Sequence, residues 1–141
     1  MTNAPMTRAE ILTDERLMSI CLQLCILSKT HLDDGESPEQ LVEHFLTDME
    51  LEEIRWIEDE DGQVVAFADF DWIASAEDVH KSAGEREVGP VLFVLKAYAK
   101  NRKLLHELKS MAPSHLYICW ERNGRIKAPK GWPVEYAQAT V

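Results

Sequence analysis

The chain has 141 residues, of which 45% are hydrophobic and 28% are charged, and its formal net charge at pH 7 is −10. This length and apolar content predict one globular domain with a substantial core. The acidic balance argues against nonspecific nucleic-acid binding by the whole surface. No apolar run is long enough to cross a bilayer and no signal peptide is recognisable, so we expect a cytoplasmic protein without a membrane partner.

Two amphipathic helices are predicted in the first third of the chain. Residues 13–29 place apolar side chains at helical spacing, and Thr13 suits the N-cap of this helix. The second helix begins at a capping box formed by Ser37 and Gln40 and ends near Glu50. These two helices therefore precede every predicted strand.

The three cysteines are an odd number and do not make a disulfide framework. Cys21 and Cys25 lie four residues apart on the first helix, and Cys119 lies far along the chain. The CxxC spacing of zinc sites is absent, and no second group of Cys or His completes a tetrahedral set. We therefore expect free, buried thiols and no metal site.

A hairpin follows the helices. Residues 54–58 and 63–73 are two extended runs rich in β-branched and aromatic residues. The sequence DEDG separates them, and Gly62 can take the positive φ that a tight turn requires. The pattern predicts an antiparallel pair, followed by a polar stretch over residues 74–88.

The second half predicts a strand–helix–strand unit. Residues 90–98 form a nearly continuous apolar run, 102–111 have helical spacing, and 115–122 form a second apolar run. Together with the hairpin, this unit predicts a mixed sheet in an α+β, α/β-sandwich fold. We expect a single domain over the whole chain, with irregular ends at residues 1–12 and 128–141.

Charge is distributed unevenly along the chain. Residues 33–61 hold thirteen acidic residues and one basic, whereas residues 96–130 hold nine basic residues and two acidic. Such an asymmetry favours a charged partner or ligand on one side, although two solvated faces would give the same pattern.

Isolated polar residues within the predicted elements are expected on the surface. His44 and His106 fall on helical faces away from the apolar stripes, which predicts solvent-exposed side chains. Asp69 and Asp71 alternate with aromatic residues and would share one sheet face. An exposed sheet face is the expected setting, and a functional carboxylate pair is the alternative.

Basic residues stand where the helix at 102–111 begins. Lys100, Arg102 and Lys103 would face the positive end of the helix dipole, which is unfavourable for cations. The same position favours an anion, because free N–H groups and the dipole point toward it. Two interpretations remain: a phosphate site formed by these residues and Asn101, or a solvent-exposed turn.

Three stretches of the sequence resemble the GNAT acyltransferase superfamily. DGQVVAFADF is similar to its second and third strands, GPVLFVLKAYAKNRKLLHELK to its fourth strand and cofactor-binding helix, and HLYICWERNG to its fifth strand. The resemblance implies a GNAT-like mixed sheet and covers roughly residues 13–127. The family's glycine-rich pyrophosphate loop is absent, because the junction reads AYAKNRKLL.

A divergent branch of the superfamily also lacks that loop. The stretch VVAFADFDWIASAED resembles the RTX-toxin-activating lysine acyltransferases, which take a fatty acyl group from acyl carrier protein. Their catalytic histidine follows the first helix, and His31 in SKTHLDD occupies the matching place, next to Asp33 and Asp34. The resemblance implies that His31 is the base. If the phosphate interpretation holds, Lys100, Asn101, Arg102 and Lys103 would bind a phosphate such as that of a phosphopantetheine arm.

Two classes of function follow, and the sequence leaves open whether the chain is catalytic. The first is an acyltransferase that moves an acyl group from acyl-CoA or acyl carrier protein to an amino group of a protein substrate, without a tightly bound cofactor. The second is a non-catalytic interaction or inhibitor protein of the kind found among degenerate phage and prophage relatives, which would use the acidic surface. The acyl group and the oligomeric state also stay open.

Overall fold

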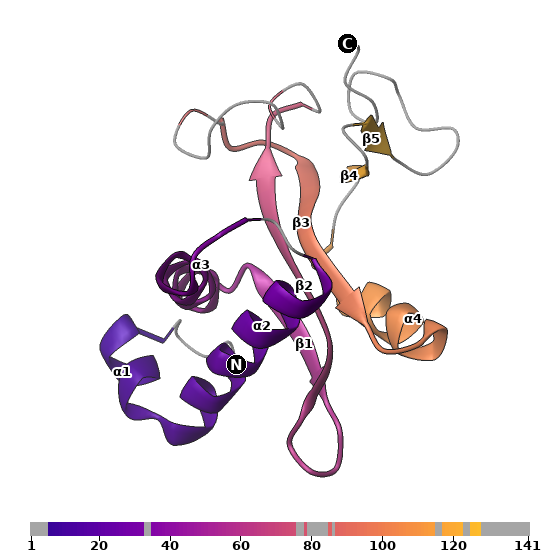
Figure 1. The fold of residues 1–141 in the computed structure, drawn as a ribbon. Coiled ribbons are helices and arrows are strands. Elements are labelled where there is room, and N and C mark those ends of the chain that lie inside the picture. The colour runs from indigo at the N-terminus through magenta and orange to yellow at the C-terminus, as the bar shows by residue number, and fades with distance from the viewer. Residues whose placement is uncertain are drawn as a thin grey trace. The chain divides into compact units, whose positions relative to one another are not determined.

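The structure is a computed structural model with an α+β fold, in which three helices precede the strands and a fourth lies between the third and fourth strands in the sequence (Figure 1). It describes residues 6–32, 35–75, 78, 85, 87–114, 117–122 and 125–127. Contacts between residues divide the chain into two compact units. The first unit is Met1–Asp69 with Lys96–Met111, and the second unit is Phe70–Leu95 with Ala112–Val141.

The strands form one mixed sheet in the order β1-β2-β3-β4-β5. Their bounds are Ile54–Glu58 for β1, Val64–Ile73 for β2, Val91–Ala99 for β3, Tyr117–Arg122 for β4 and Arg125–Lys127 for β5. The predicted hairpin is confirmed: β1 and β2 are antiparallel, and Gly62 in the turn has φ of 79°. The predicted parallel pairing of β3 with β4 is also confirmed.

Four helices are present in the described part of the chain: α1 at Arg8–Thr13, α2 at Glu15–His31, α3 at Pro38–Leu51 and α4 at Arg102–Ser110. The prediction of an irregular stretch over residues 1–12 is wrong from Arg8 onward, and three helices precede the sheet rather than two. The predicted cap Thr13 ends α1, and Asp14 caps α2 by accepting a hydrogen bond from the Leu17 N–H. None of these helices is both long and apolar enough to span a membrane.

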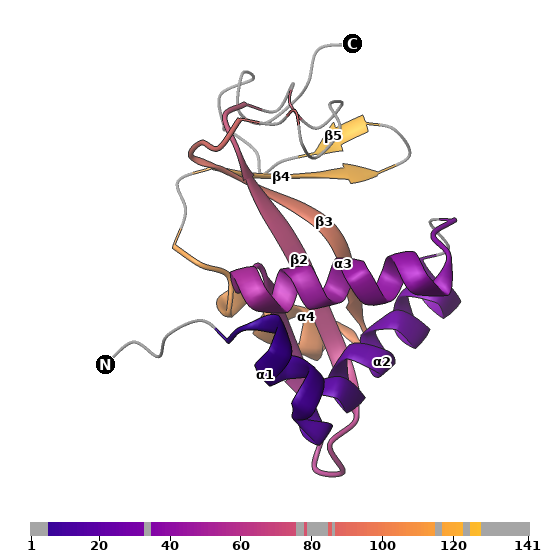
Figure 2. The same cartoon turned by 90° about the vertical axis from the view of Figure 1, so that its left-hand side faces the viewer.

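The first unit has its core between α1–α3 and the β1–β2 hairpin. Helices α1, α2 and α3 lie on one side of the hairpin, and α4 lies on the other (Figures 1 and 2). Phe45 of α3 and Phe67 of β2 are fully buried and meet edge to face at 5.7 Å between ring centroids. Burying such aromatic pairs excludes water from this side of the sheet and fixes α3 over β2.

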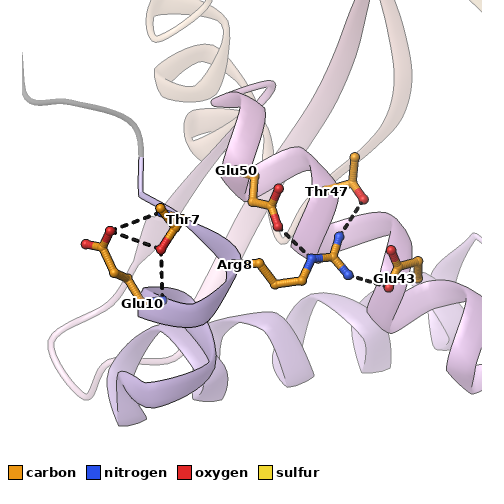
Figure 3. A network of polar contacts seen from close by, with 6 residues as sticks. All are labelled: Thr7, Arg8, Glu10, Glu43, Thr47 and Glu50. Atoms are coloured by element: carbon orange, nitrogen blue, oxygen red, sulfur yellow. Dashed lines mark hydrogen bonds and ion pairs between the residues drawn. The ribbon is translucent and has the colours of Figure 1, made fainter.

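Arg8 ties α1 to α3, as Figure 3 shows. Its guanidinium contacts Glu43 at 2.5 Å, Glu50 at 2.6 Å and the Thr47 hydroxyl at 3.0 Å, which places all three partners on one face of α3. Thr7 caps α1 through a capping box with Glu10. The short helix is thus held at its beginning by two sets of polar contacts.

The second unit has a smaller core around the other half of the sheet. Ile73, Val91, Phe93 and Cys119 are buried together there. Gly89 precedes β3 and lies against the main chain at the end of β2, where an added Cβ would be 2.7 Å from the carbonyl oxygen of Ile73. This close approach requires glycine. The polar stretch at 74–88 lies largely outside the described residues, as do residues 128–141.

Candidate functional site

A buried cluster of one imidazole and two carboxylates lies between α3 and the sheet in the first unit. His44 and Asp48 are four residues apart on α3, so their side chains lie on the same helical face. Asp69 lies on β2, opposite Ile54 of β1. The imidazole Nε2 of His44 hydrogen-bonds to Oδ2 of Asp69 and lies 3.2 Å from Oδ2 of Asp48.

The burial of this cluster contradicts the sequence-based expectation for two of its members. The His44 side chain is only 25% exposed, and the Asp69 side chain is 0% exposed. The prediction that both residues face solvent is therefore wrong. The apolar stripe of α3 does not predict the burial of His44, because the sheet also covers the side of the helix that carries His44. The alternating pattern of β2 does not predict the burial of Asp69, because it does not show which face of the strand a helix covers.

Burial and mutual contacts shift the protonation of the cluster. Burial lowers the pKa of His44, but its interactions with the carboxylates of Asp48 and Asp69 outweigh this and raise the pKa to about 10. Burial raises the pKa of Asp48 to about 9, and the neighbouring Asp69 adds to the increase while His44 opposes it. Two carboxylates at close range in a buried site favour keeping a proton on one of them.

Lys96 of β3 connects this cluster to Glu36. Its main-chain N–H donates to Oδ1 of Asp69 at 2.8 Å, and its ammonium lies 2.9 Å from Oε1 of Glu36. The Lys96 side chain is 9% exposed, and this burial lowers the pKa of its ammonium. Sequence reasoning missed Lys96, since a single lysine at the end of an apolar run gives no signal of burial.

His31, the predicted catalytic residue, is the last residue of α2 and is exposed to solvent. Its ring stacks on Tyr98 of β3 with 4.4 Å between ring centroids. Asp33 and Asp34, which the sequence places beside it, lie outside the described residues. The structure thus brings His31 against β3, in the same half of the strand as Lys96.

The predicted phosphate residues gather at the beginning of α4. Lys100, Arg102 and Lys103 are all exposed. Asn101 caps the helix, because its Oδ1 accepts a hydrogen bond of 2.9 Å from the N–H of Leu104. One of the N–H groups that a phosphate would use is therefore already bonded within the protein. His106 on the same helix is exposed, which confirms that prediction.

A hollow of about 400 Å³ lies elsewhere in the first unit, among residues of α1, α2, α3 and β1 and beside Met111, which follows α4. Ile54, Trp56, Met49 and Met111 contribute to its mostly apolar lining. None of the predicted site residues lines it. The thiols are free as expected; Cys21 and Cys119 are buried, and Cys25 is half-buried.

No model of a known protein family matches the chain, and neither a curated protein nor a solved structure matches it.

Proposed function

We propose that this chain is a GNAT-like N-acyltransferase that moves an acyl group from acyl-CoA or acyl carrier protein to an amino group. The observation that carries the proposal is the position of His31. Its exposed ring stacks on Tyr98 of β3. Tyr98 lies beyond Val94, the last β3 residue paired with β4. The candidate base therefore lies beside the part of β3 that is implied to receive the acyl donor.

The strand arrangement supports the same proposal. Parallel pairing joins Val91–Val94 to Tyr117–Trp120, while β3 itself continues to Ala99. In the superfamily that the sequence resembles, the acyl donor binds where these two strands separate, and its pantetheine amides pair with the strand's main chain. The corresponding segment here is the end of β3, which leads directly into Asn101 and α4.

The proposed reaction needs a base and a stabilised oxyanion. An amine of the acceptor attacks the thioester carbonyl, a C–N bond forms, and the C–S bond breaks. His31 takes the proton that the amine loses, and the departing thiolate takes up a proton. Main-chain N–H groups where the strands separate would stabilise the oxyanion. Lys100, Arg102 and Lys103 would attract the phosphates of the donor.

The experiment is an acyl-transfer assay with acyl-CoA and with acyl carrier protein as donors and a lysine-containing peptide as acceptor. His31→Ala should abolish transfer and change the melting temperature little, because the side chain is exposed. His106→Ala is the matched control, since His106 is also an exposed helical histidine, and it should retain full activity. Equal activity in His31→Ala and wild type would exclude His31 as the base.

A non-catalytic interaction protein is the second candidate, and one observation favours it. The hairpin turn presents Asp59, Glu60 and Asp61, all exposed, at the end of the acidic stretch over residues 33–61. Such a turn suits a basic protein partner. If the wild type transfers no acyl group and neither donor changes its melting temperature, this second candidate becomes the better one.

A further inference from the structure

One imidazole and two carboxylates meet at the cluster of His44, Asp48 and Asp69. An imidazole nitrogen and one oxygen from each carboxylate all lie within 4.8 Å of one another. His44 and Asp48 come from one face of α3, and Asp69 comes from β2. Imidazole nitrogen and carboxylate oxygen are both ligands of divalent transition metals. The cluster lies under the helices rather than on an open acidic surface.

One oxygen of this cluster lacks a hydrogen bond. The Asp48 side chain is 8% exposed, and its Oδ2 accepts no hydrogen bond from the described residues. Nε2 of His44 lies 3.2 Å from this oxygen, but the nitrogen already bonds to Asp69. A ring nitrogen carries one proton and cannot serve both carboxylates. A buried carboxylate oxygen without a hydrogen bond is costly, and Oδ2 of Asp48 is therefore an acceptor that a ligand at this cluster could use.

The carboxylate of Asp69 is oriented for this task. Its Oδ1 accepts the main-chain N–H of Lys96 at 2.8 Å, so Oδ2 is turned toward His44 and Asp48. Metal-binding carboxylates are commonly fixed in this way by a hydrogen bond to their second oxygen. The Asp69 side chain is completely buried, which holds the ligand in one orientation.

We propose that His44, Asp48 and Asp69 bind a divalent transition-metal cation of the Zn²⁺ or Mn²⁺ type. Ligand bonds of about 2.0–2.2 Å place tetrahedral ligands roughly 3.3 Å apart. The 3.2 Å between His44 Nε2 and Asp48 Oδ2 fits this spacing, and the cation would replace the direct hydrogen bond between His44 and Asp69 by a bond to each of them. Two carboxylates and a neutral imidazole also match the charge of the cation. Three protein ligands leave at least one coordination position for water, and the 25% exposed His44 side chain marks the side from which the cation enters.

The site is separate from the proposed acyl transfer. None of its three ligands belongs to the residues proposed for that reaction, and His31 and Tyr98 take no part in it. The cation would link α3 to β2 and so join the helical layer to the sheet. One partial signal is visible in the sequence, because the spacing in HFLTD puts His44 and Asp48 on one helical face. Asp69 is contributed by another element.

The test is metal binding by the reduced full chain after removal of metals with EDTA. Zn²⁺ and Mn²⁺ are titrated by calorimetry, with Mg²⁺ as the comparison, and melting temperatures are measured in parallel. We expect one equivalent of cation and an increase in melting temperature of about 5–10 °C at a hundredfold excess over the dissociation constant. Co²⁺ substitution should give visible bands without thiolate-to-cobalt charge transfer, because no cysteine is a ligand.

Asp48→Asn is the decisive variant. It should weaken cation binding by roughly 100-fold or more. Replacing a residue that only orients a metal ligand typically weakens metal affinity by about 10–100-fold, so a ligand itself should cost more. The metal-free variant should melt at the same temperature as wild type or higher, since the change removes a buried carboxylate whose Oδ2 is not hydrogen-bonded. Glu39→Gln is the matched control, because Glu39 is an exposed acidic residue of the same helix, and it should bind as wild type does.

The outcomes decide the proposal in both directions. Loss of binding in Asp48→Asn with retention in Glu39→Gln supports it. Wild-type affinity in Asp48→Asn, no stoichiometric binding of any cation by wild type, or a thiolate band in the Co²⁺ spectrum overturns it. Should Asp48→Asn fail to fold by circular dichroism, His44→Gln provides the same comparison.

Discussion

The main-chain N–H of Lys96 donates a hydrogen bond of 2.8 Å to the buried carboxylate of Asp69. The other oxygen of that carboxylate bonds to His44 of α3. Asp69 therefore joins β2, β3 and α3 through one side chain. Its removal would leave the Lys96 N–H without this acceptor and the imidazole without its closest counterion.

Asp69→Ala should destabilise the metal-free protein strongly. Removing one partner of a buried charged pair typically costs about 3–5 kcal/mol. Asp69→Asn should cost less, because the amide oxygen still accepts the Lys96 N–H. Chemical unfolding in the presence of EDTA measures both. Asp61→Ala in the exposed hairpin turn is the control and should stay within about 0.5 kcal/mol of wild type. An Asp69→Ala variant as stable as this control would contradict the role given to Asp69.

Much of the sheet could be predicted because its signals are local. Alternation and the DG turn predict the β1–β2 hairpin, and two apolar runs around a helical pattern predict the parallel pair. Helix α1 was missed, although its signal was present: Thr7 and Glu10 have the spacing of a capping box. A helix of six residues is too short for periodicity to reveal.

The buried cluster could be predicted only in part, for a physical reason. His44 and Asp48 are neighbours because they lie four residues apart on a helix, and this spacing can be read from the sequence. Asp69 reaches them only because α3 packs over β2, and that packing depends on the whole core. The burial of Lys96 has the same origin. No local pattern predicts that His31 lies next to β3, and its proposed role as a base rests on the family resemblance.

Gly89→Ala should destabilise the second unit. The added Cβ would lie 2.7 Å from the Ile73 carbonyl oxygen and 2.8 Å from the Ala74 nitrogen, closer than such atoms normally approach. Forced shifts of this kind cost about 1–3 kcal/mol. Urea unfolding of Gly89→Ala and of Val88→Ala measures the effect. Val88 is 87% exposed and provides the neighbouring control. Equal stability of the two variants would show that the main chain moves apart without cost.

Cys119 should make stability depend on alkaline pH. Burial raises the pKa of its thiol from 9.0 to about 11 in the folded protein. The unfolded chain therefore ionises first, so this contribution is fully present below pH 9 and is lost as pH rises through about 11. The loss amounts to at most about 3 kcal/mol. Comparing wild type with Cys119→Ala across this range isolates it, because other groups titrate equally in both. Parallel pH profiles would contradict the raised pKa.

The basic beginning of α4 should respond to charge reversal with opposite signs in the free and the bound protein. Replacing Arg102 and Lys103 with Glu places acidic side chains at the positive end of the helix dipole, which should stabilise the free protein by about 0.5 kcal/mol. The same change should weaken binding of CoA or acyl carrier protein, because like charges then face the phosphate. Binding by wild type should also weaken as salt concentration rises. Melting curves with and without each donor measure both effects.

Lys109→Glu is the matched control for this charge reversal, since Lys109 lies in the last turn of the same helix. It should destabilise the free protein slightly, because a cation is favourable at a helix C-terminus, and it should leave donor binding unchanged. A double variant that is more stable alone and gains nothing from the donor, beside a Lys109→Glu variant that still gains, identifies a phosphate site. If neither donor raises the melting temperature of wild type, Asn101 caps an ordinary solvated turn, and Lys100, Arg102 and Lys103 hold no phosphate of these donors.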